Sequence, residues 1–193
     1  MLFRSEAFSD GVIAIIITIM VLEMKVPHDP SLAGLVKIAP VFLSYVLSFV
    51  YVAIYWVNHH HMLHAVKHVN ASSLWANIHL LSWLSIVPFV TGWMGENHFA
   101  QWPVFAYAVV MLCAAIAFTI LARTLIAANG GAQSNLARAL GGDRKGKLSI
   151  VVYIASIAAS FAHPLAACAG FVIVAVIWLV PDRRIERILR EER

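Results

Sequence analysis

Long stretches without a single charged side chain recur along almost the whole of this 193-residue chain. They leave no room for a separate soluble domain of ordinary size. Hydrophobic residues make up 61% of the chain, charged residues make up 12%, and the mean hydropathy is +0.81. These values lie well outside those of soluble globular domains. We therefore expect an all-α integral membrane protein with one membrane domain that covers residues 1–193.

Five charge-free stretches mark the candidate membrane spans. The last one, Leu148 to Val180, has 33 residues. As one helix it would be roughly 50 Å long, and the hydrocarbon core of a bilayer is only about 30 Å thick. Because Pro164 disfavours helix at His163 and removes a backbone donor, we divide this stretch and predict six spans in all. The other four stretches are Val12 to Leu22, Ile38 to Val57, Ala71 to Gly95, and Gln101 to Ala122.

The distribution of lysine and arginine predicts the orientation of the chain in the membrane. With six spans, twelve of these residues fall on one side, and only Lys25 and Lys37 fall on the other. The positive-inside rule then places both termini in the cytoplasm, as expected for a multi-pass protein of the cell membrane. Residues 129–147 become a cytoplasmic linker, and residues 181–193 become a basic cytoplasmic tail. This topology and contact with anionic lipid explain the pI near 9.3 without a nucleic-acid partner.

The first apolar stretch is short for a membrane anchor. Twelve residues separate Asp10 from Glu23, and as a helix they cover roughly 18 Å. A charged group at either end would then lie at membrane depth, where an ionisable residue is by default a candidate functional site. Ser9 or Asp10 could instead cap the N-terminus of the helix. A capping role does not exclude a second role.

One narrow face of this helix could line a pore. If copies of the helix surrounded a symmetric axis, that face would stack rings of isoleucine and leucine around one ring of threonine hydroxyls. Such a hydrophobic constriction can gate ions by dewetting. Ordinary packing of aliphatic side chains explains the same residues without a pore. At 100° per residue, the face contains Phe8, Gly11, Ile15, Thr18, Ile19 and Leu22.

The second span ends in a run of histidines. His61, His64 and His68 are spaced to share one helical face and could ligate zinc, copper or haem. A histidine-rich membrane haem or metal oxidoreductase is therefore one alternative function. No carboxylate or thiolate accompanies these histidines locally, however, and histidines at a membrane boundary are often solvated. Imidazole and indole groups of this span could instead bond to Ser9 and Asp10 in a buried polar network.

The third span carries scattered polar side chains that suit hydrogen bonding between helices. They lack the paired acids of a hydrolase and the dense carboxylates of a proton-coupled transporter. A proton-coupled transporter with Asp10 as its carrier group stays open as a third function. The polar residues of this span are Asn77, His79, Ser82, Ser85 and Thr91.

The start of the chain, "RSEAFSDG", resembles the R-x-x-x-F-S-D-G signature of the transmembrane protein 175 family, which comprises potassium-permeable channels of lysosomes and prokaryotes. Residues 55–60, "YWVNHH", and residues 88–96, "PFVTGWMGE", are similar to the second and third helices of that family. Beyond about residue 100 the likeness is mainly one of hydropathy. The signature positions are Arg4, Phe8, Ser9, Asp10 and Gly11.

The resemblance implies an architecture and a function. It implies six helices per repeat around a central pore lined by the first helix, and the single repeat of this chain implies a homotetramer. The implied function is passive conduction of potassium and other monovalent cations, without enzymatic activity. The implied partners are the bilayer, the permeant cations and other copies of the chain, with no cofactor and no bound metal.

The resemblance also assigns roles to residues. It places a hydrophobic constriction at Ile15, continued by Ile19 and Leu22, with Thr18 as the polar ring. The remaining signature residues are implied to form a hydrogen-bonded network between helices and not to coordinate the ion. That network comprises Arg4, Ser9 and Asp10 of the first helix together with Trp56, His59 and Asn77.

Overall fold

The computed structural model describes residues 2–179, and within that range every regular element is a helix. This all-α architecture confirms the predicted fold class. Three short helices lie in the connections, α2 (Leu32–Lys37), η1 (Gly131–Gln133) and α6 (Asn135–Leu140). The long helices are α1 (Leu2–Leu22), α3 (Ala39–His64), α4 (Ala71–Glu96), α5 (Gln101–Ala128), α7 (Arg144–Ala162) and α8 (Pro164–Leu179).

Five of the long helices, α1, α3, α4, α5 and α7, are long and apolar enough to cross a membrane, and α8 is a shorter apolar helix. The predicted break in the last stretch is confirmed, since His163 is extended and α8 starts at Pro164. Val180, the predicted end of that stretch, and the predicted tail, residues 181–193, lie outside the described residues. The chain is a membrane protein, and the count of six spans stays a prediction.

Several helices extend beyond the charge-free stretches. α3 continues past Val57 to His64, and α5 continues past Ala122 to Ala128. The predicted linker at residues 129–147 is shorter than expected, because α7 already begins at Arg144. Asp143 caps that helix, its carboxylate accepting a hydrogen bond from the backbone N–H of Gly146 at 3.1 Å. The first charged residue therefore does not mark where these helices begin or end.

The largest departure from expectation concerns the first helix. α1 begins at Leu2, so Ser9 and Asp10 lie inside the helix, and the expectation that either residue caps it is wrong. Its 21 residues extend about 31 Å, close to the thickness of the hydrocarbon core. The apolar run from Val12 is thus only the second part of a full-length span. The polar residues before it are compatible with helix because α3 and α4 supply their partners, as described below.

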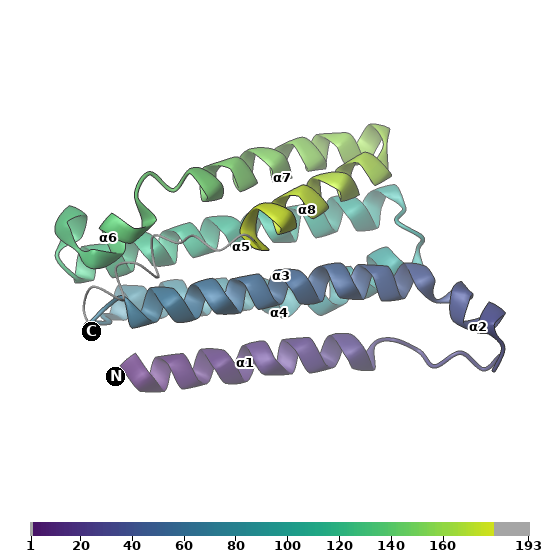
Figure 1. Cartoon of the computed structure of the whole chain (residues 1–193), viewed down its shortest axis with the longest axis horizontal. Coiled ribbons are helices and arrows are strands. Elements are labelled where there is room, and N and C mark those ends of the chain that lie inside the picture. The colour runs from purple at the N-terminus through teal and green to yellow at the C-terminus, as the bar shows by residue number, and fades with distance from the viewer. Residues whose placement is uncertain (1, 180–193) are drawn as a thin grey trace.

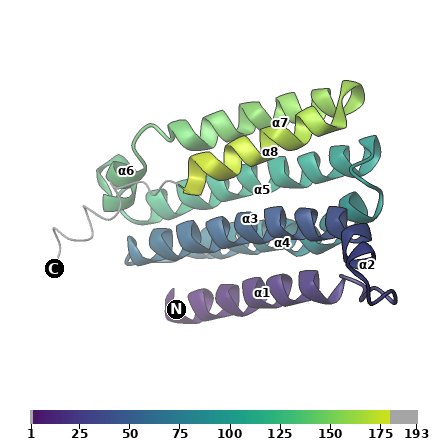
Figure 2. The same ribbon diagram turned by 45° about the vertical axis from the view of Figure 1, so that its right-hand side comes forward.

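The long helices lie side by side, with α1 at one edge of the molecule (Figures 1 and 2). α1 packs against α3 and α4, while α5 packs against α4, α7 and α8. The core runs between these layers, where Val52, Leu80 and Tyr107 are fully buried. From α1 it receives Ile13, Ile16 and Met20. The opposite side of α1 is covered by no other helix in the described part of the chain.

Hydrogen bonds between polar side chains join the central helices, and one glycine permits their close approach. Thr91 of α4 donates a hydrogen bond to the Ser48 hydroxyl of α3 at 2.7 Å, and Ser48 in turn bonds to Tyr107 of α5 at 3.0 Å. At Gly95, a Cβ atom would lie 2.7 Å from the Cα atom of Val41, so only glycine permits the approach of α4 to α3 here. The predicted role of Thr91 in bonding between helices is therefore confirmed.

Candidate functional site

The outer side of α1 presents a row of apolar side chains outside the core. Ile15 is 58% exposed and Leu22 is 81% exposed, whereas Ile16, one position along, is buried. Thr18 lies in the same row, and its hydroxyl donates a hydrogen bond to the Ile15 carbonyl oxygen at 2.9 Å. We call this row the exposed face of α1. Its members are Phe8, Gly11, Ile15, Thr18, Ile19 and Leu22.

Packing within one chain therefore does not account for these aliphatic side chains. The same holds for Gly11, because a Cβ atom built there would meet nothing within 4 Å. The residues that α1 buries are those of the opposite face, including Ile13 and Met20. The exposed face is left for lipid, for water or for another copy of the chain.

A groove of about 620 Å³ borders the exposed face, between α1 and α4. Ile15 and Ile19 line it from α1, and Phe89 and Trp93 line it from α4. Two carboxylates, Glu23 and Glu96, lie on its lining as well. Glu96 is the last residue of α4, and Glu23 directly follows the last residue of α1. The groove therefore has an apolar wall and two carboxylates at one end.

Lys25, in the segment after α1, forms an ion pair with α4 beside the two carboxylates of the groove. Its Nζ atom lies 2.9 Å from Oε1 of Glu96, in an exposed ion pair. The hydrogen bond to Glu96 and its negative charge raise the pKa of Lys25 above its ordinary value. The amine is therefore protonated at neutral pH, and it joins the segment that follows α1 to the end of α4 by an exposed ion pair.

A buried polar network attaches the first half of α1 to α3 and α4. Asn77 Nδ2 donates to Ser9 Oγ at 2.8 Å, and the Ser9 hydroxyl donates to the Ser5 carbonyl oxygen at 2.9 Å. His59 Nε2 lies 2.7 Å from Asn77 Oδ1. Because that oxygen can only accept, His59 carries its proton on Nε2. Ser9, His59 and Asn77 are all buried, so this chain of bonds fixes the register of α1 against its neighbours.

Asp10 is held by a second contact between helices. The indole nitrogen of Trp56 in α3 donates to Asp10 Oδ1 at 2.9 Å. A hydrogen bond to an ionised carboxylate is stronger than one between neutral groups. Asp10 is half-buried, and its bonded oxygen is directed at α3. The geometry suits a residue that positions α1.

The structure thus brings together five of the six residues expected in the network and leaves one apart. Arg4 is exposed, and its side chain makes no hydrogen bond and no ion pair with residues 2–179. Phe8 is exposed on the same side. The five that meet across helices are Ser9, Asp10, Trp56, His59 and Asn77.

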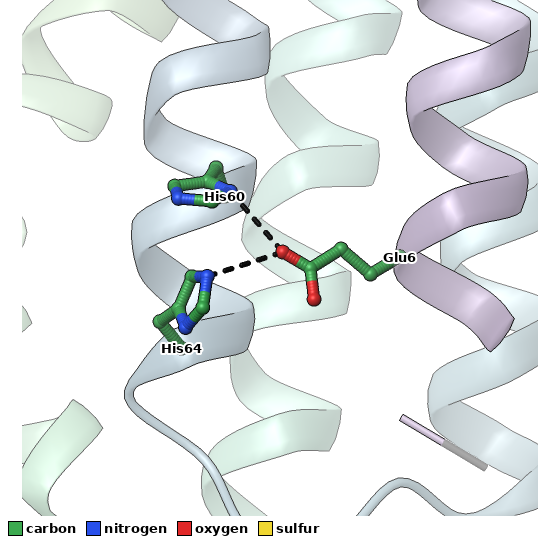
Figure 3. Close-up of side chains that lie close together, drawn as sticks. All are labelled: Glu6, His60 and His64. Carbon is green, nitrogen blue, oxygen red and sulfur yellow. Dashed lines mark ion pairs between the residues drawn. The ribbon is translucent and has the colours of Figure 1, made fainter. Parts of the chain in front are cut away.

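A further cluster joins α1 to α3 and was missed from the sequence. Glu6 Oε1 lies 3.1 Å from His60 Nδ1 and 3.2 Å from His64 Nε2 (Figure 3). The set of His61, His64 and His68 considered from the sequence does not share one helical face, because α3 ends at His64 and His68 lies beyond it. The i, i+4 spacing of His60 and His64 was visible in the sequence. The carboxylate was not, since it belongs to another helix.

Comparison with known proteins agrees with this architecture. The model of the family described as endosomal/lysosomal potassium channel TMEM175 matches residues 4–88. A protein of Chryseobacterium sp. (strain P1-3) that is named a potassium channel is 53% identical over 188 residues, covering 97% of each chain. A potassium channel of Streptomyces collinus is 35% identical over 126 residues, or 61% of each chain. TMEM175 of Danio rerio, named an endosomal/lysosomal proton channel, is 41% identical over 78 residues, which are 15% of its length.

The fold has a counterpart among solved structures. The crystal structure of a lysosomal potassium-selective channel TMEM175 homolog from Chamaesiphon minutus superposes with a TM-score of 0.83. The match covers 94% of this chain and 97% of that one, at 27% identity. The extent of these similarities, together with the signature on α1, shows that the chain belongs to the TMEM175 family.

Proposed function

We propose that this chain is the subunit of a homotetrameric channel of the cell membrane that conducts potassium passively. Its bacterial relatives are named potassium channels, and the matching crystal structure is that of a potassium-selective channel homolog. The family and these relatives are channels and not enzymes, so the oxidoreductase hypothesis is abandoned. Residues 1–193 act as one channel domain with both termini in the cytoplasm and no cofactor.

The observation that carries the proposal is the exposed face of α1. A helix that only faces lipid is apolar along its whole length, because ionisable groups at membrane depth are costly. α1 instead has Asp10 before its apolar run and Thr18 within that run, and Glu23 directly follows the helix. Four copies of this face around an axis form a short apolar constriction with wetter regions on both sides.

Ile15 forms the narrowest ring of that constriction in the proposed tetramer. Ile19 and Leu22 continue the apolar wall outward, and Thr18 adds hydroxyl oxygens that replace part of the hydration shell of the ion. The Thr18 proton is already donated to the Ile15 carbonyl, which leaves the oxygen lone pairs to face a cation. The network of Ser9, Asn77 and His59 sets the rotation of α1 that presents these residues.

Potassium flux from proteoliposomes tests this function. In Ile15→Asn, the amide side chains wet the constriction, and we expect faster potassium flux and weaker discrimination against sodium. The rate rises roughly tenfold for each 1.4 kcal/mol by which wetting lowers the barrier. Flux is measured with opposed potassium and sodium gradients in vesicles of equal protein content.

Val21→Asn is the matched control. Val21 is also an exposed aliphatic residue of α1, at 44%, but it lies outside the row that contains Ile15. We expect its flux to equal that of the unmodified protein. Equal stimulation by both variants, or none by Ile15→Asn, would contradict a constriction at Ile15. Flux that saturates with potassium and disappears in Asp10→Asn would instead favour the transporter hypothesis.

A further inference from the structure

The cluster of Glu6, His60 and His64 is composed of metal-ligating groups that converge on one point. The three ligand atoms lie within 4.8 Å of one another, and they come from both α1 and α3 (Figure 3). The Glu6 oxygen is 3.1 Å from the His60 nitrogen and 3.2 Å from the His64 nitrogen. None of these residues belongs to the signature or to the constriction.

These separations match a coordination sphere. Zinc binds imidazole nitrogen and carboxylate oxygen at about 2.0 to 2.2 Å, so two ligand atoms of a tetrahedral site are roughly 3.3 Å apart. The two observed oxygen to nitrogen distances already lie near that value. The separation between the two nitrogens needs at most a modest adjustment of the His64 side chain, which is more than half exposed.

The orientation of His60 favours a shared cation over a simple ion pair. Its Nδ1 atom is buried and makes no hydrogen bond within residues 2–179, although the Glu6 oxygen is only 3.1 Å away. The ring nitrogen and the oxygen are therefore not aligned as donor and acceptor. A ring nitrogen that lies close to a carboxylate oxygen without bonding to it is free to share a cation with that oxygen.

The rings are also held in place by their surroundings. The His60 ring stacks on Trp56 at 5.8 Å between centroids, and the His64 ring meets it edge to face at 4.2 Å. Trp56 is itself fixed by its hydrogen bond to Asp10. Groups that orient the ligands in this way strengthen metal binding.

The side chains of the cluster are partly exposed in the single chain. The Glu6 side chain is 17% exposed, whereas that of His60 is 38% and that of His64 is 53% exposed. Three protein ligands leave a fourth position for water, as in zinc sites that are open on one side. The site therefore combines a partly buried carboxylate with an accessible edge.

We infer that Glu6, His60 and His64 bind one divalent transition metal ion of the zinc class. The two imidazoles and one carboxylate suit zinc better than magnesium or calcium, which prefer oxygen ligands alone. The ion bridges the start of α1 to the end of α3. It thereby cross-links the helix that carries the exposed face to the helix that carries Trp56 and His59.

Zinc titration of the purified full-length protein tests the site without any measurement of ion flux. After treatment with a chelator, we expect calorimetry to give saturable binding of one Zn²⁺ per chain. Glu6→Gln and His64→Ala should each weaken the apparent affinity at least roughly tenfold. Zinc should also raise the midpoint of thermal unfolding of the unmodified protein, because it binds the folded state, and should raise it less in these variants.

His68→Ala is the matched control, since His68 is an exposed histidine just beyond the end of α3. Its zinc affinity should equal that of the unmodified protein. His64→Cys should restore binding that His64→Ala loses, because a thiolate also ligates zinc. Absence of saturable binding, full affinity in the Glu6→Gln, His64→Ala double variant, or equal loss in His68→Ala would overturn the site. None of these results depends on whether the chain conducts potassium.

Discussion

At the scale of single residues, Asn77 bonds to two other helices at once. It uses both ends of its amide, donating to Ser9 on α1 and accepting from His59 on α3. All three side chains are buried, so none can turn to water if a partner is lost. The amide therefore specifies how three helices fit together, and a residue of similar size without polar atoms cannot replace it.

Asn77→Leu should consequently destabilise the protein. The change conserves volume but leaves the Nε2–H of His59 buried without an acceptor, which costs about 1 to 3 kcal/mol. We expect a lower midpoint of thermal unfolding in detergent. Ser82→Ala in the same helix is the control, because the Ser82 hydroxyl is exposed and bonds only to its own backbone at His79. Equal midpoints for the two variants would show that the network contributes little to stability.

At the scale of the helices, the close approach of α3 and α4 depends on one position. Gly95 lies against the backbone of Val41, whereas Gly92, one turn earlier, has nothing within 4 Å of its Cβ position. Gly95→Ala forces the two helices apart, and overpacking of this kind typically costs 1 to 3 kcal/mol. We predict a lower unfolding midpoint for Gly95→Ala and an unchanged or higher one for Gly92→Ala.

Only those helix boundaries that depend on local sequence could be predicted from the sequence. The spans and the break at Pro164 follow from local properties, namely charge-free length and the missing backbone donor of proline. The start of α1 did not follow, because Glu6, Ser9 and Asp10 are compatible with a membrane helix only through partners on other helices. For the same reason the cluster of Glu6, His60 and His64 was missed. Its carboxylate lies more than fifty positions away in the chain.

At the scale of the whole molecule, one chain leaves an apolar face without a partner. Phe8, Ile15 and Leu22 form a stripe along the edge helix, next to the groove between α1 and α4. The proposed tetramer would bury this stripe on its axis, and we therefore predict that the purified protein has the mass of four chains after correction for detergent. Light scattering coupled to size exclusion measures that mass.

The variants Ile15→Asn and Val21→Asn also serve as a comparison for the measured mass. An Asn at either position should preserve the mass of four chains, because the axis can be wetted without separating the subunits. A monomer mass for the unmodified protein would contradict the proposed assembly, and with it the constriction on the axis. A dimer mass would require a pore built from two exposed faces only.

The position of α1 at the edge has a practical consequence. It is connected to α2 by residues 23–31, which contain no helix, and it is attached elsewhere only through side chains that pack or bond across helices. A chain divided in that connection after Lys25 would retain the contacts that locate α1, including the ion pair of Lys25 with Glu96. The molecule is thus suited to assembly from two separately made pieces, in which the first is short enough for chemical synthesis and can carry side chains beyond the twenty natural ones.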